Sequence, residues 1–326
     1  MRALICADGQ LVLDARAPEP EVAPGAALVR TLRAGISPID VAVARGAIAH
    51  KGVMGHEFVG VVERVEGEAG TSLVGRRVVG QPEIVCATCD LCRTGLSRHC
   101  RSRRTLGVGG TPGCIAERFA IPVRNLVALP ETVDLDSAAL AEPLASALHA
   151  AQIVRIVGKT YVTVLGDDAH ALLAAQVMAR QNASVRVLGQ QPERFAIAEK
   201  WGVKHRHASE AGRRSDQDVV LCAAPDARSL IDAMGMVRPR GKIVLRGADV
   251  HERADWSGVD LSLIADSELE IVGARGGRVA DAVAALEQKH YDVGSLIGRR
   301  FRIDDAVSAL RAAAEPGAMK ILIEFP

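Results

Sequence analysis

Four cysteines lie close together in the stretch CATCDLCRTGLSRHC, separated by two, two and seven residues. Four thiolates complete a tetrahedral shell around zinc and leave no open position for water or substrate. A disulfide pair is the alternative, and it explains this spacing less well. We therefore predict a structural zinc in a lobe at residues 86–100. The predicted ligands are Cys86, Cys89, Cys92 and Cys100.

A second candidate for metal chemistry is the segment GHEFVG at residues 55–60. A neutral ring nitrogen of His56 can bind zinc, and Glu57 is a neighbouring carboxylate that can enter or leave the metal shell. The alternative is a histidine that packs beneath a strand. The segment alone favours that alternative, and a metal site requires support from other motifs.

The elements that must position these residues change in character along the chain. Residues 1–125 hold short β-rich runs that end at Gly or Pro, which predicts an all-β unit carrying the metal lobe. Residues 126–272 alternate strands with helices, which predicts a parallel, doubly wound sheet. Residues 273–326 hold a helix and a closing strand, which we expect to complete the sheet edge and the first domain. The predicted fold class is thus α/β with two domains.

The composition excludes several classes of protein. The chain has 326 residues, a formal net charge of +1, and no single-sign tail that would indicate a nucleic-acid partner. No apolar run reaches the roughly 20 residues that span a bilayer, and the N-terminal residues do not resemble a signal peptide. Seven cysteines, four of them in one cluster, fit a reducing compartment. We expect a cytoplasmic protein that binds neither nucleic acid nor membrane.

Several motifs in order resemble a known family. GHEFVG, the four-cysteine lobe, AEPLASALHA, the βαβ pattern and GAMKILIEF are similar to the zinc-dependent alcohol dehydrogenase-like branch of the medium-chain dehydrogenase/reductase superfamily. The resemblance covers essentially the whole chain. It implies a GroES-like catalytic domain, a Rossmann cofactor domain and hydride transfer to or from a nicotinamide. In that family a catalytic zinc polarises the substrate oxygen.

The resemblance carries over to the first ligand segment only in part. In AGISPID, Asp40 matches the family aspartate that would orient His56. Ser37 stands where the family has a cysteine ligand, and a neutral hydroxyl binds zinc far less well than a thiolate. Ile39 replaces the usual proton-relaying Thr or Ser. Ser37 is the candidate replacement for that hydroxyl.

The third ligand of the family falls in AEPLA. Glu142 matches the glutamate that polyol-dehydrogenase-like members use, so His56, Glu142 and Glu57 form the candidate catalytic zinc site. A carboxylate favoured by the N-terminus of a helix is the alternative interpretation of Glu142. The resemblance leaves the occupancy of this second zinc site open.

The cofactor fingerprint departs from the family pattern Gly-x-Gly-x-x-Gly. After the strand YVTVLG, its six positions are occupied by Gly166, Asp167, Asp168, Ala169, His170 and Ala171. Ala171 satisfies the close-packing role of the third glycine. Asp168 instead places bulk and negative charge where the pyrophosphate would approach a helix N-terminus. The predicted cofactor-binding loop therefore carries an unfavourable charge.

The second strand of the βαβ unit ends at Gly189, and Gln190 follows it. The Asp or Glu that would bind the ribose hydroxyls of NAD is missing there. Arg194 lies too far along the chain for a 2′-phosphate clamp. The resemblance therefore does not choose between NAD and NADP.

Two hypotheses about function follow. The first is an NAD(P)H-dependent oxidoreductase that acts on a small carbonyl, alcohol or activated double bond, with or without a catalytic zinc. The second is a catalytically silent family member that serves as a binding or assembly protein and keeps only the structural zinc. His56, Glu57, Asp40 and Glu142 remain together, which favours the enzyme. The resemblance also implies a homodimer or tetramer.

Overall fold

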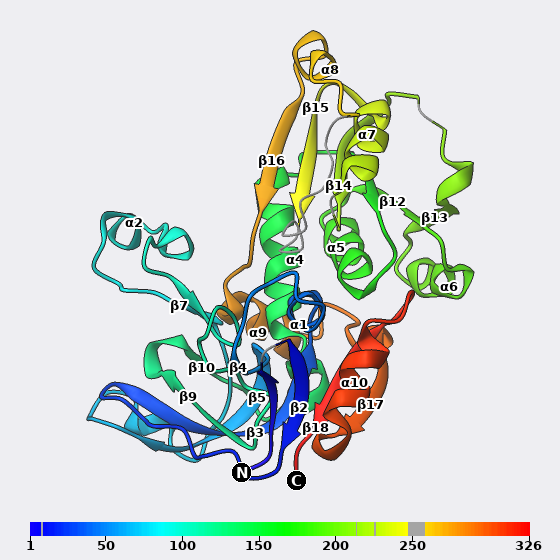
Figure 1. Ribbon diagram of the computed structural model, residues 1–326. Coiled ribbons are helices and arrows are strands. Elements are labelled where there is room, and N and C mark those ends of the chain that lie inside the picture. The colour runs from blue at the N-terminus through cyan, green and yellow to red at the C-terminus, as the bar shows by residue number, and fades with distance from the viewer. Residues whose placement is uncertain (8, 213, 225, 247–257) are drawn as a thin grey trace. The chain divides into compact units, whose positions relative to one another are not determined.

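The chain forms two compact units in the computed structural model (Figure 1). One unit comprises Met1–Glu142 and Arg278–Pro326, and the other comprises Pro143–Gly277. The boundary between them lies inside a helix rather than near residue 126, because the run AEPLASALHA keeps helical spacing across it. The structure describes all residues except 8, 213, 225 and 247–257.

Strands from both ends of the chain join the main sheet of the first unit. Its strands are β3 (Ala26–Ile36), β5 (Glu57–Val65), β6 (Arg77–Gly80), β9 (Arg118–Pro122), β10 (Leu126–Ala128), β17 (Ile297–Arg302) and β18 (Lys320–Glu324). Their order is β10–β6–β5–β3–β18–β17, and β9 also pairs with β3. β18 pairs antiparallel with β3 and parallel with β17, so the last residues of the chain lie against the first domain's central strand.

Smaller elements complete the first unit. Two further sheets are formed by β2 (Gln10–Asp14), β1 (Ala3–Ala7) and β4 (Gly52–Val53), and by β7 (Glu83–Ile84) and β8 (Arg104–Thr105). The helices are α1 (Pro38–Ala44), α2 (Asp90–Arg93), α3 (Leu135–Ala138), α9 (Val279–Glu287) and α10 (Ala306–Ala313). Single 3₁₀ turns lie at Thr71–Leu73, Ser97–His99, Val123–Asn125, Gly294–Leu296 and Ile303–Asp305.

The second unit is a six-stranded parallel sheet among the residues described. Its strands are β11 (Tyr161–Leu165), β12 (Ser184–Gly189), β13 (Lys204–His207), β14 (Gln217–Cys222), β15 (Val237–Arg246) and β16 (Glu270–Ala274). The order β13–β12–β11–β14–β15–β16 corresponds to 3-2-1-4-5-6, which is the dinucleotide-binding order of doubly wound sheets. This order confirms the predicted fold class.

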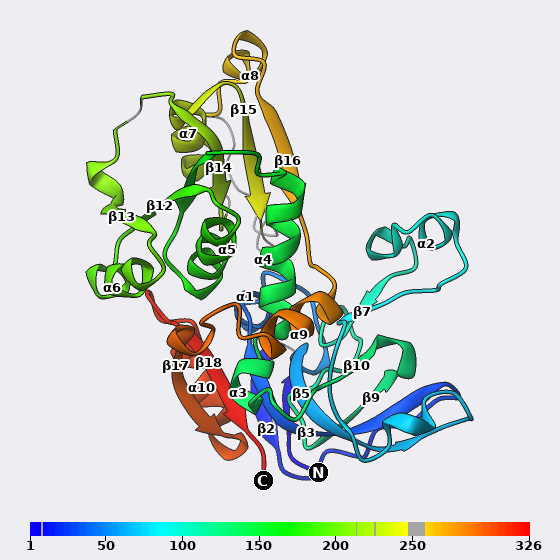
Figure 2. The ribbon, with the colours of Figure 1, turned by 180° about the vertical axis from the view of Figure 1, so that it is seen from behind.

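Helices connect the strands of this sheet. They are α5 (Ala169–Arg180), α6 (Pro192–Lys200), α7 (Ala227–Met236) and α8 (Ser262–Asp266), with a 3₁₀ turn at Ala208–Glu210. The helix α4 (Ala141–Val154) starts in the first unit, and its later part lies beside β15 and β16 (Figure 2). Val162, Val164 and Val187 are fully buried, as expected for strands covered on both faces.

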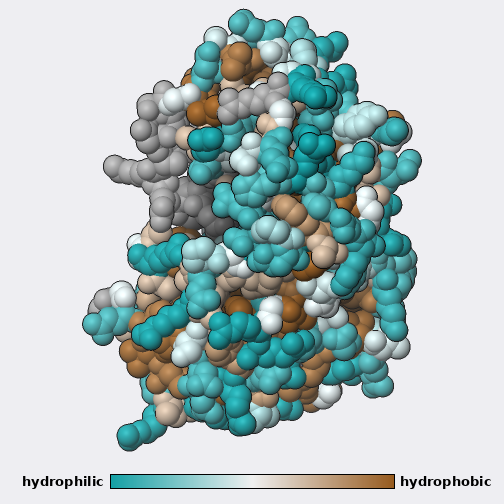
Figure 3. All heavy atoms as spheres, turned by 90° about the vertical axis from the view of Figure 1, so that its right-hand side faces the viewer, coloured by the Kyte–Doolittle hydropathy of each residue, from teal (hydrophilic) through white to brown (hydrophobic). Residues whose placement is uncertain are grey.

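One face of the molecule is mostly polar. The face drawn in Figure 3 carries hydrophilic side chains over most of its area, with hydrophobic groups between them. Among the described residues, no helix is both long enough and apolar enough to cross a bilayer. The lone cysteines Cys6, Cys114 and Cys222 are buried, where they act as small core residues.

Candidate active site and zinc lobe

The four cysteines of the predicted zinc lobe come together. The paired strands β7 and β8 hold the two ends of the lobe side by side. The sulfur–sulfur distances are 3.5 Å for Cys89–Cys92 and Cys86–Cys100, 3.9 Å for Cys86–Cys92 and 4.0 Å for Cys89–Cys100. A regular tetrahedron with zinc–sulfur bonds of about 2.3 Å has edges of about 3.8 Å. The donor set therefore fits zinc.

The local backbone favours ionisation of one of these thiols. Backbone hydrogen bonds from Thr88 and Cys89 lower the pKa of Cys86 to about 5. Partial burial and then the neighbouring Cys89 thiol raise the pKa of Cys92 to about 12. A divalent cation would favour the thiolate at both positions because of its charge. A bound metal would therefore keep sulfurs ionised that otherwise differ widely in pKa.

A second cluster of potential ligands is formed by His56, Glu57 and Glu142. One ligand atom from each residue lies within 4.8 Å of the others. His56 is only 4% exposed, and its Nδ1 has no hydrogen-bond partner within the described structure. Buried polar atoms are rarely left unsatisfied, so this nitrogen indicates a place for a ligand or substrate. Glu142 lies in the first turn of α4, where the helix N-terminus favours a carboxylate.

The carboxylate of Glu57 is held by a buried lysine. Lys320, the first residue of β18, forms an ion pair with Glu57, and the two side chains are 2% and 0% exposed. The Lys320 Nζ also donates to the backbone oxygen of Ile36 at 2.9 Å. A side chain on Gly35 would overlap the Glu57 carboxylate, so this glycine makes room for it. One oxygen of Glu57 is therefore held by Lys320, and Oε1 has no hydrogen-bond partner within the described structure.

The segment AGISPID builds a helix cap. The Ser37 hydroxyl donates to Asp40 Oδ2 at 2.7 Å, and the Asp40 amide donates to Ser37 Oγ at 3.2 Å. This reciprocal capping box, with Pro38 at the first helical position, starts α1. Asp40 makes no hydrogen bond to His56 among the described contacts, in contrast to the orienting role expected from the resemblance. One oxygen of its carboxylate is used in the cap of α1, and the other has no hydrogen-bond partner within the described structure.

The second cluster is a weaker candidate for zinc than the four cysteines. A catalytic zinc site needs three protein ligands in addition to the substrate position. Lys320 pairs with one oxygen of Glu57, but Glu57 Oε1 has no hydrogen-bond partner within the described structure, so the predicted set keeps three possible ligands. One nitrogen, two carboxylates and no thiolate make a weak set for zinc, and the same groups can handle a proton at a substrate oxygen.

The predicted cofactor loop connects β11 with α5. Gly166 has φ of +114°, a conformation that few other residues adopt. Asp168 is the N-cap of α5, and its Oδ1 accepts from the Ala171 amide at 2.7 Å. The strand, turn and helix thus form a backbone frame that fits a dinucleotide. However, the Asp168 carboxylate already binds a helix N-terminal amide to which a phosphate would be attracted.

Asp167 bridges the cofactor loop to the end of β12. Its Oδ2 accepts from the amides of Gln190 and Gln191, each at 2.7 Å. Its Oδ1 accepts from Arg194 at 3.0 Å. The structure thus brings together Asp167, Gly189 and Gln190, which were predicted as cofactor residues on separate segments. The hydrogen bonds from Arg194 to Asp167 were not predicted, because a contact between two separate loops leaves no pattern in the sequence.

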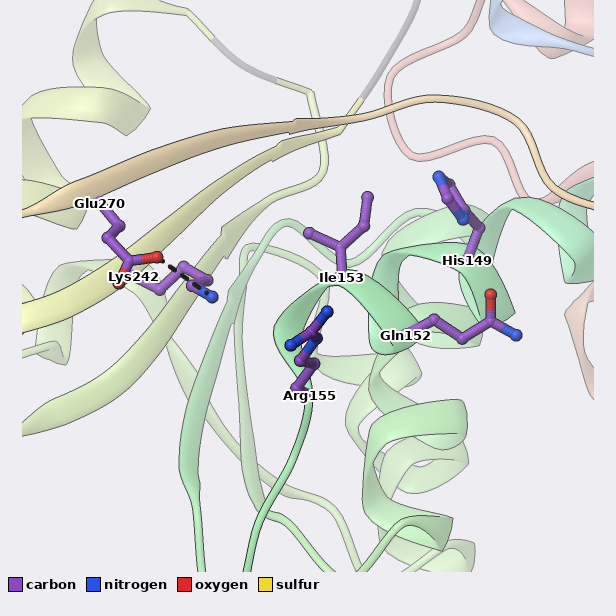
Figure 4. Close-up of a pocket in the computed structure, with 6 residues that line it drawn as sticks. All are labelled: His149, Gln152, Ile153, Arg155, Lys242 and Glu270. Atoms are coloured by element: carbon purple, nitrogen blue, oxygen red, sulfur yellow. Dashed lines mark ion pairs between the residues drawn. The ribbon is translucent and has the colours of Figure 1, made fainter. Parts of the chain in front are cut away.

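A cavity of about 630 Å³ lies elsewhere in the second unit, between the end of α4 and the strands β15 and β16 (Figure 4). Lys242 and Glu270 form an ion pair of 3.2 Å at its wall. The lining residues are His149, Gln152, Ile153, Arg155, Lys242 and Glu270. None of the predicted site residues is among them, so this cavity is separate from the candidate active site.

The fold and the clusters define a class of protein. A β-rich unit with a four-cysteine lobe, joined to a parallel sheet of dinucleotide-binding order, is the arrangement of a zinc-type dehydrogenase. Residues 23–131 match the family described as "Alcohol dehydrogenase GroES-like domain".

Relatives extend this match to the whole chain. The L-threonine 3-dehydrogenase of Chelativorans sp. (strain BNC1) is 31% identical over 95% of this chain and 94% of its own length. The alcohol dehydrogenase TADH from Thermus sp. ATN1 is 26% identical with a TM-score of 0.87, and the match covers 100% of both chains. An E. coli CFT073 alcohol dehydrogenase complexed with NADH has a TM-score of 0.90 at 24% identity, over 100% of this chain and 99% of its own.

The chain belongs to the zinc-dependent alcohol dehydrogenase-like branch of the medium-chain dehydrogenase/reductase superfamily. It is an enzyme of this type, an NAD(P)-dependent oxidoreductase. The prediction of an oxidoreductase is thus confirmed, and the hypothesis of a catalytically silent binding protein is not favoured.

Sequence reasoning also missed Lys320. The residue lies in GAMKILIEF, which carried part of the family resemblance, but the pattern around it reads as a plain closing strand. Only the pairing of β18 with β3 places its ammonium group against Glu57. A lysine within an otherwise apolar strand was the available signal, since buried lysines nearly always have a partner.

Proposed function

We propose that the chain catalyses the reversible oxidation of a small secondary alcohol to a ketone, with a nicotinamide dinucleotide as the hydride carrier. The buried cluster of His56, Glu57 and Glu142 carries this proposal, because it concentrates proton-handling groups around an unsatisfied imidazole nitrogen in the structure described. Relationship to proteins named L-threonine 3-dehydrogenase supports a hydroxyl as the reacting group. Reduction of an activated double bond is the alternative reaction.

The chain's own residues would orient the substrate and move one proton. The nicotinamide, when bound, accepts or supplies the hydride. His56 would hydrogen-bond the substrate oxygen, and Glu142 would take its proton during oxidation and return it during reduction. Ser37 and Asp40 would support the site by building the start of α1, where the Ser37 hydroxyl donates a hydrogen bond to Asp40.

We propose one resident zinc, held by Cys86, Cys89, Cys92 and Cys100. The near-tetrahedral sulfur distances support it. The proposed reaction uses no second zinc, because one nitrogen and two carboxylates without a thiolate are a weak set of ligands for zinc. The cofactor would lie against Gly166, Asp168 and Ala171 of the second unit, whose backbone frame supports dinucleotide binding.

The two units would divide the work of the enzyme. The first unit would be the GroES-like catalytic domain and the second the Rossmann cofactor domain. A homodimer or tetramer and a cytoplasmic location stay predictions. The oligomeric state is expected from the family resemblance, and β16 is an edge strand of its sheet that could pair with a second copy. The location is expected from the cysteine usage.

Turnover by the full-length protein tests the proposed function. Purified enzyme is assayed with NADH and NADPH on small ketones, and in reverse with small secondary alcohols that include L-threonine. We expect His56→Ala to lower kcat/KM by about 100-fold or more, since a positioned proton-handling group contributes that much. The matched control His290→Ala changes an exposed histidine and should keep full activity.

Two results of these assays would contradict the proposed function. Absence of turnover with every alcohol, ketone and activated alkene, in folded protein that holds its zinc and binds a cofactor, would contradict the proposed reaction. Equal activity of the His56→Ala and His290→Ala variants would remove His56 from it.

A further inference from the structure

The end of β12 lacks an acidic residue of its own but has a carboxylate from another strand. In dinucleotide-binding sheets an acid at this point binds the ribose hydroxyls of NAD. Here the strand ends at Gly189 and continues with Gln190 and Gln191. The Asp167 carboxylate, which comes from the turn after β11, accepts from both of these glutamine amides at 2.7 Å. The missing charge is therefore present at the same point, supplied by the neighbouring strand.

The close approach of the two segments depends on Gly189. A Cβ at this position would lie 2.5 Å from the Asp167 Cβ and 2.6 Å from its Cγ. No side chain larger than hydrogen can therefore occupy residue 189 while Asp167 stays in place. Gly189 therefore leaves the space at the end of β12 that the Asp167 carboxylate occupies.

Arg194 is committed to Asp167. Its Nη1 donates to the Asp167 backbone oxygen at 2.7 Å and to Oδ1 at 3.0 Å. The Arg194 side chain is 3% exposed, whereas that of Asp167 is 12% exposed. An incoming 2′-phosphate would meet the carboxylate rather than the guanidinium. A carboxylate has about four acceptor positions, and the three hydrogen bonds to its oxygens leave room for a ribose hydroxyl.

We propose that Asp167 determines the choice of cofactor and makes the enzyme prefer the dinucleotide with a free ribose 2′-hydroxyl over the 2′-phosphorylated form. The carboxylate accepts a hydrogen bond from the hydroxyl and repels the phosphate. This inference rests on the proposed nicotinamide-dependent function. It deepens that function by assigning NAD to a chain whose strand-end sequence alone chooses neither cofactor.

Binding of NADH and NADPH to the full-length protein tests this inference without any need for turnover. Titrations followed by nucleotide fluorescence give both dissociation constants. We expect the wild-type protein to bind NADH at least about tenfold more tightly than NADPH, the effect of one like-charge contact in a partly solvated site. Asp167→Asn should bring the NADPH/NADH ratio of dissociation constants close to one, mainly by tightening NADPH.

Asp168→Asn is the matched control, because it removes one charge from the adjacent residue. Asp168 caps α5 near the expected pyrophosphate, which both cofactors share, so this variant should shift both dissociation constants equally and keep their ratio. Should Asp167→Asn fail to fold, Gln190→Arg provides a second measurement. Gln190 is exposed, and a cation there should tighten NADPH about tenfold or more relative to NADH.

The outcomes separate this inference from the proposed function. Wild-type protein that binds NADPH as tightly as NADH, an unchanged ratio in Asp167→Asn, or no response of NADPH to Gln190→Arg would overturn the role of Asp167 alone. A different outcome would overturn the inference and the proposed function together. In that outcome neither the wild-type protein nor the Asp167 and Asp168 variants bind NADH or NADPH with a dissociation constant below the millimolar range.

Discussion

At the scale of single residues, two adjacent aspartates in one turn have different partners. Asp168 caps the helix that follows it, and Asp167 reaches sideways to the end of the next strand. Both use a carboxylate to satisfy backbone amides that a bound dinucleotide would otherwise approach. Both side chains therefore stabilise the fold, and in our proposals Asp168 opposes the pyrophosphate, whereas Asp167 opposes only a 2′-phosphate.

Asp168→Gly should separate these two effects. Removal of the carboxylate should tighten NADH by about 10-fold or more, because it removes a like charge close to the pyrophosphate. It should also destabilise the protein slightly, since replacing an N-cap aspartate with glycine costs a few tenths of a kcal/mol. Fluorescence titration and thermal unfolding of the same preparation measure the two changes. Unchanged NADH affinity would mean that the phosphates do not approach this turn.

At the scale of elements, β18 links the C-terminal segment to the candidate site. Its first residue, Lys320, is paired with Glu57 of β5 across the intervening strand β3. Removal of one partner from a buried ion pair leaves an uncompensated charge, which is far more costly than removal of both partners. Single and double variants of Lys320 and Glu57 should therefore differ in stability.

Lys320→Met should destabilise the protein by about 3–5 kcal/mol, because Glu57 would be left buried without its counterion. The double variant Lys320→Met/Glu57→Gln should recover most of this loss. Denaturant unfolding monitored for the first unit measures both. The control Lys242→Met breaks a partly exposed pair with Glu270 and should change stability by less than about 1 kcal/mol. A double variant as unstable as the single one would show that packing of Lys320 matters more than its charge.

Asp136 joins three elements of the first unit and should make their stability depend on pH. It follows the first residue of α3, and accepts from Arg33 of β3 at 3.0 Å and from Arg300 of β17 at 2.7 Å. Burial acts to raise the pKa of Asp136, but hydrogen bonds from Arg300 and Arg33 outweigh it and lower the pKa below its ordinary value. The ionised form therefore stabilises the fold above the unfolded-state pKa, and this contribution is lost as pH falls through the lower folded-state pKa.

Asp136→Asn should lower stability by about 1–2 kcal/mol at neutral pH, given two charge-assisted hydrogen bonds that are partly exposed. The difference from wild type should shrink below about pH 4, where the wild-type carboxyl also becomes neutral. Unfolding curves at several pH values measure this. Asp281→Asn, which alters an exposed pair with Arg278, is the control and should have little effect at any pH. A constant difference down to pH 2 would exclude titration of Asp136 as the cause.

At the scale of the whole molecule, the metal content distinguishes the two candidate zinc sites. The sulfur cluster fits zinc, whereas the cluster around His56 offers one nitrogen and two carboxylates without a thiolate, which is a weaker set of ligands. Metal analysis of the purified wild-type protein should find about one zinc per chain, as expected for a filled four-cysteine site alone. Cys92→Ser should reduce this value to nearly zero, and His56→Ala should leave it unchanged. A value near two in the wild-type protein, falling to one in His56→Ala, would establish a catalytic zinc.

Much of the fold could be predicted because its signals are local. Valine-rich runs alternate with apolar helical segments, and this period alone predicts the parallel sheet that the structure contains. The place where the chain passes between units was less accessible. Residues Ala141–Val154 keep a helical pattern on both sides of Glu142, so composition shows no boundary there.

The residues of the candidate site could be predicted from the sequence, but the contacts between them could not. The four-cysteine lobe could be predicted from the sequence, because four thiolates at this spacing have few other uses, and His56, Glu57 and Glu142 could be named as possible ligands. That Lys320 pairs with Glu57 and that Asp167 reaches the end of β12 became visible only in the folded chain. The difference lies in distance along the chain. A metal lobe is closed by residues close in sequence, whereas ion pairs between strands depend on sheet order and register, which no local pattern encodes.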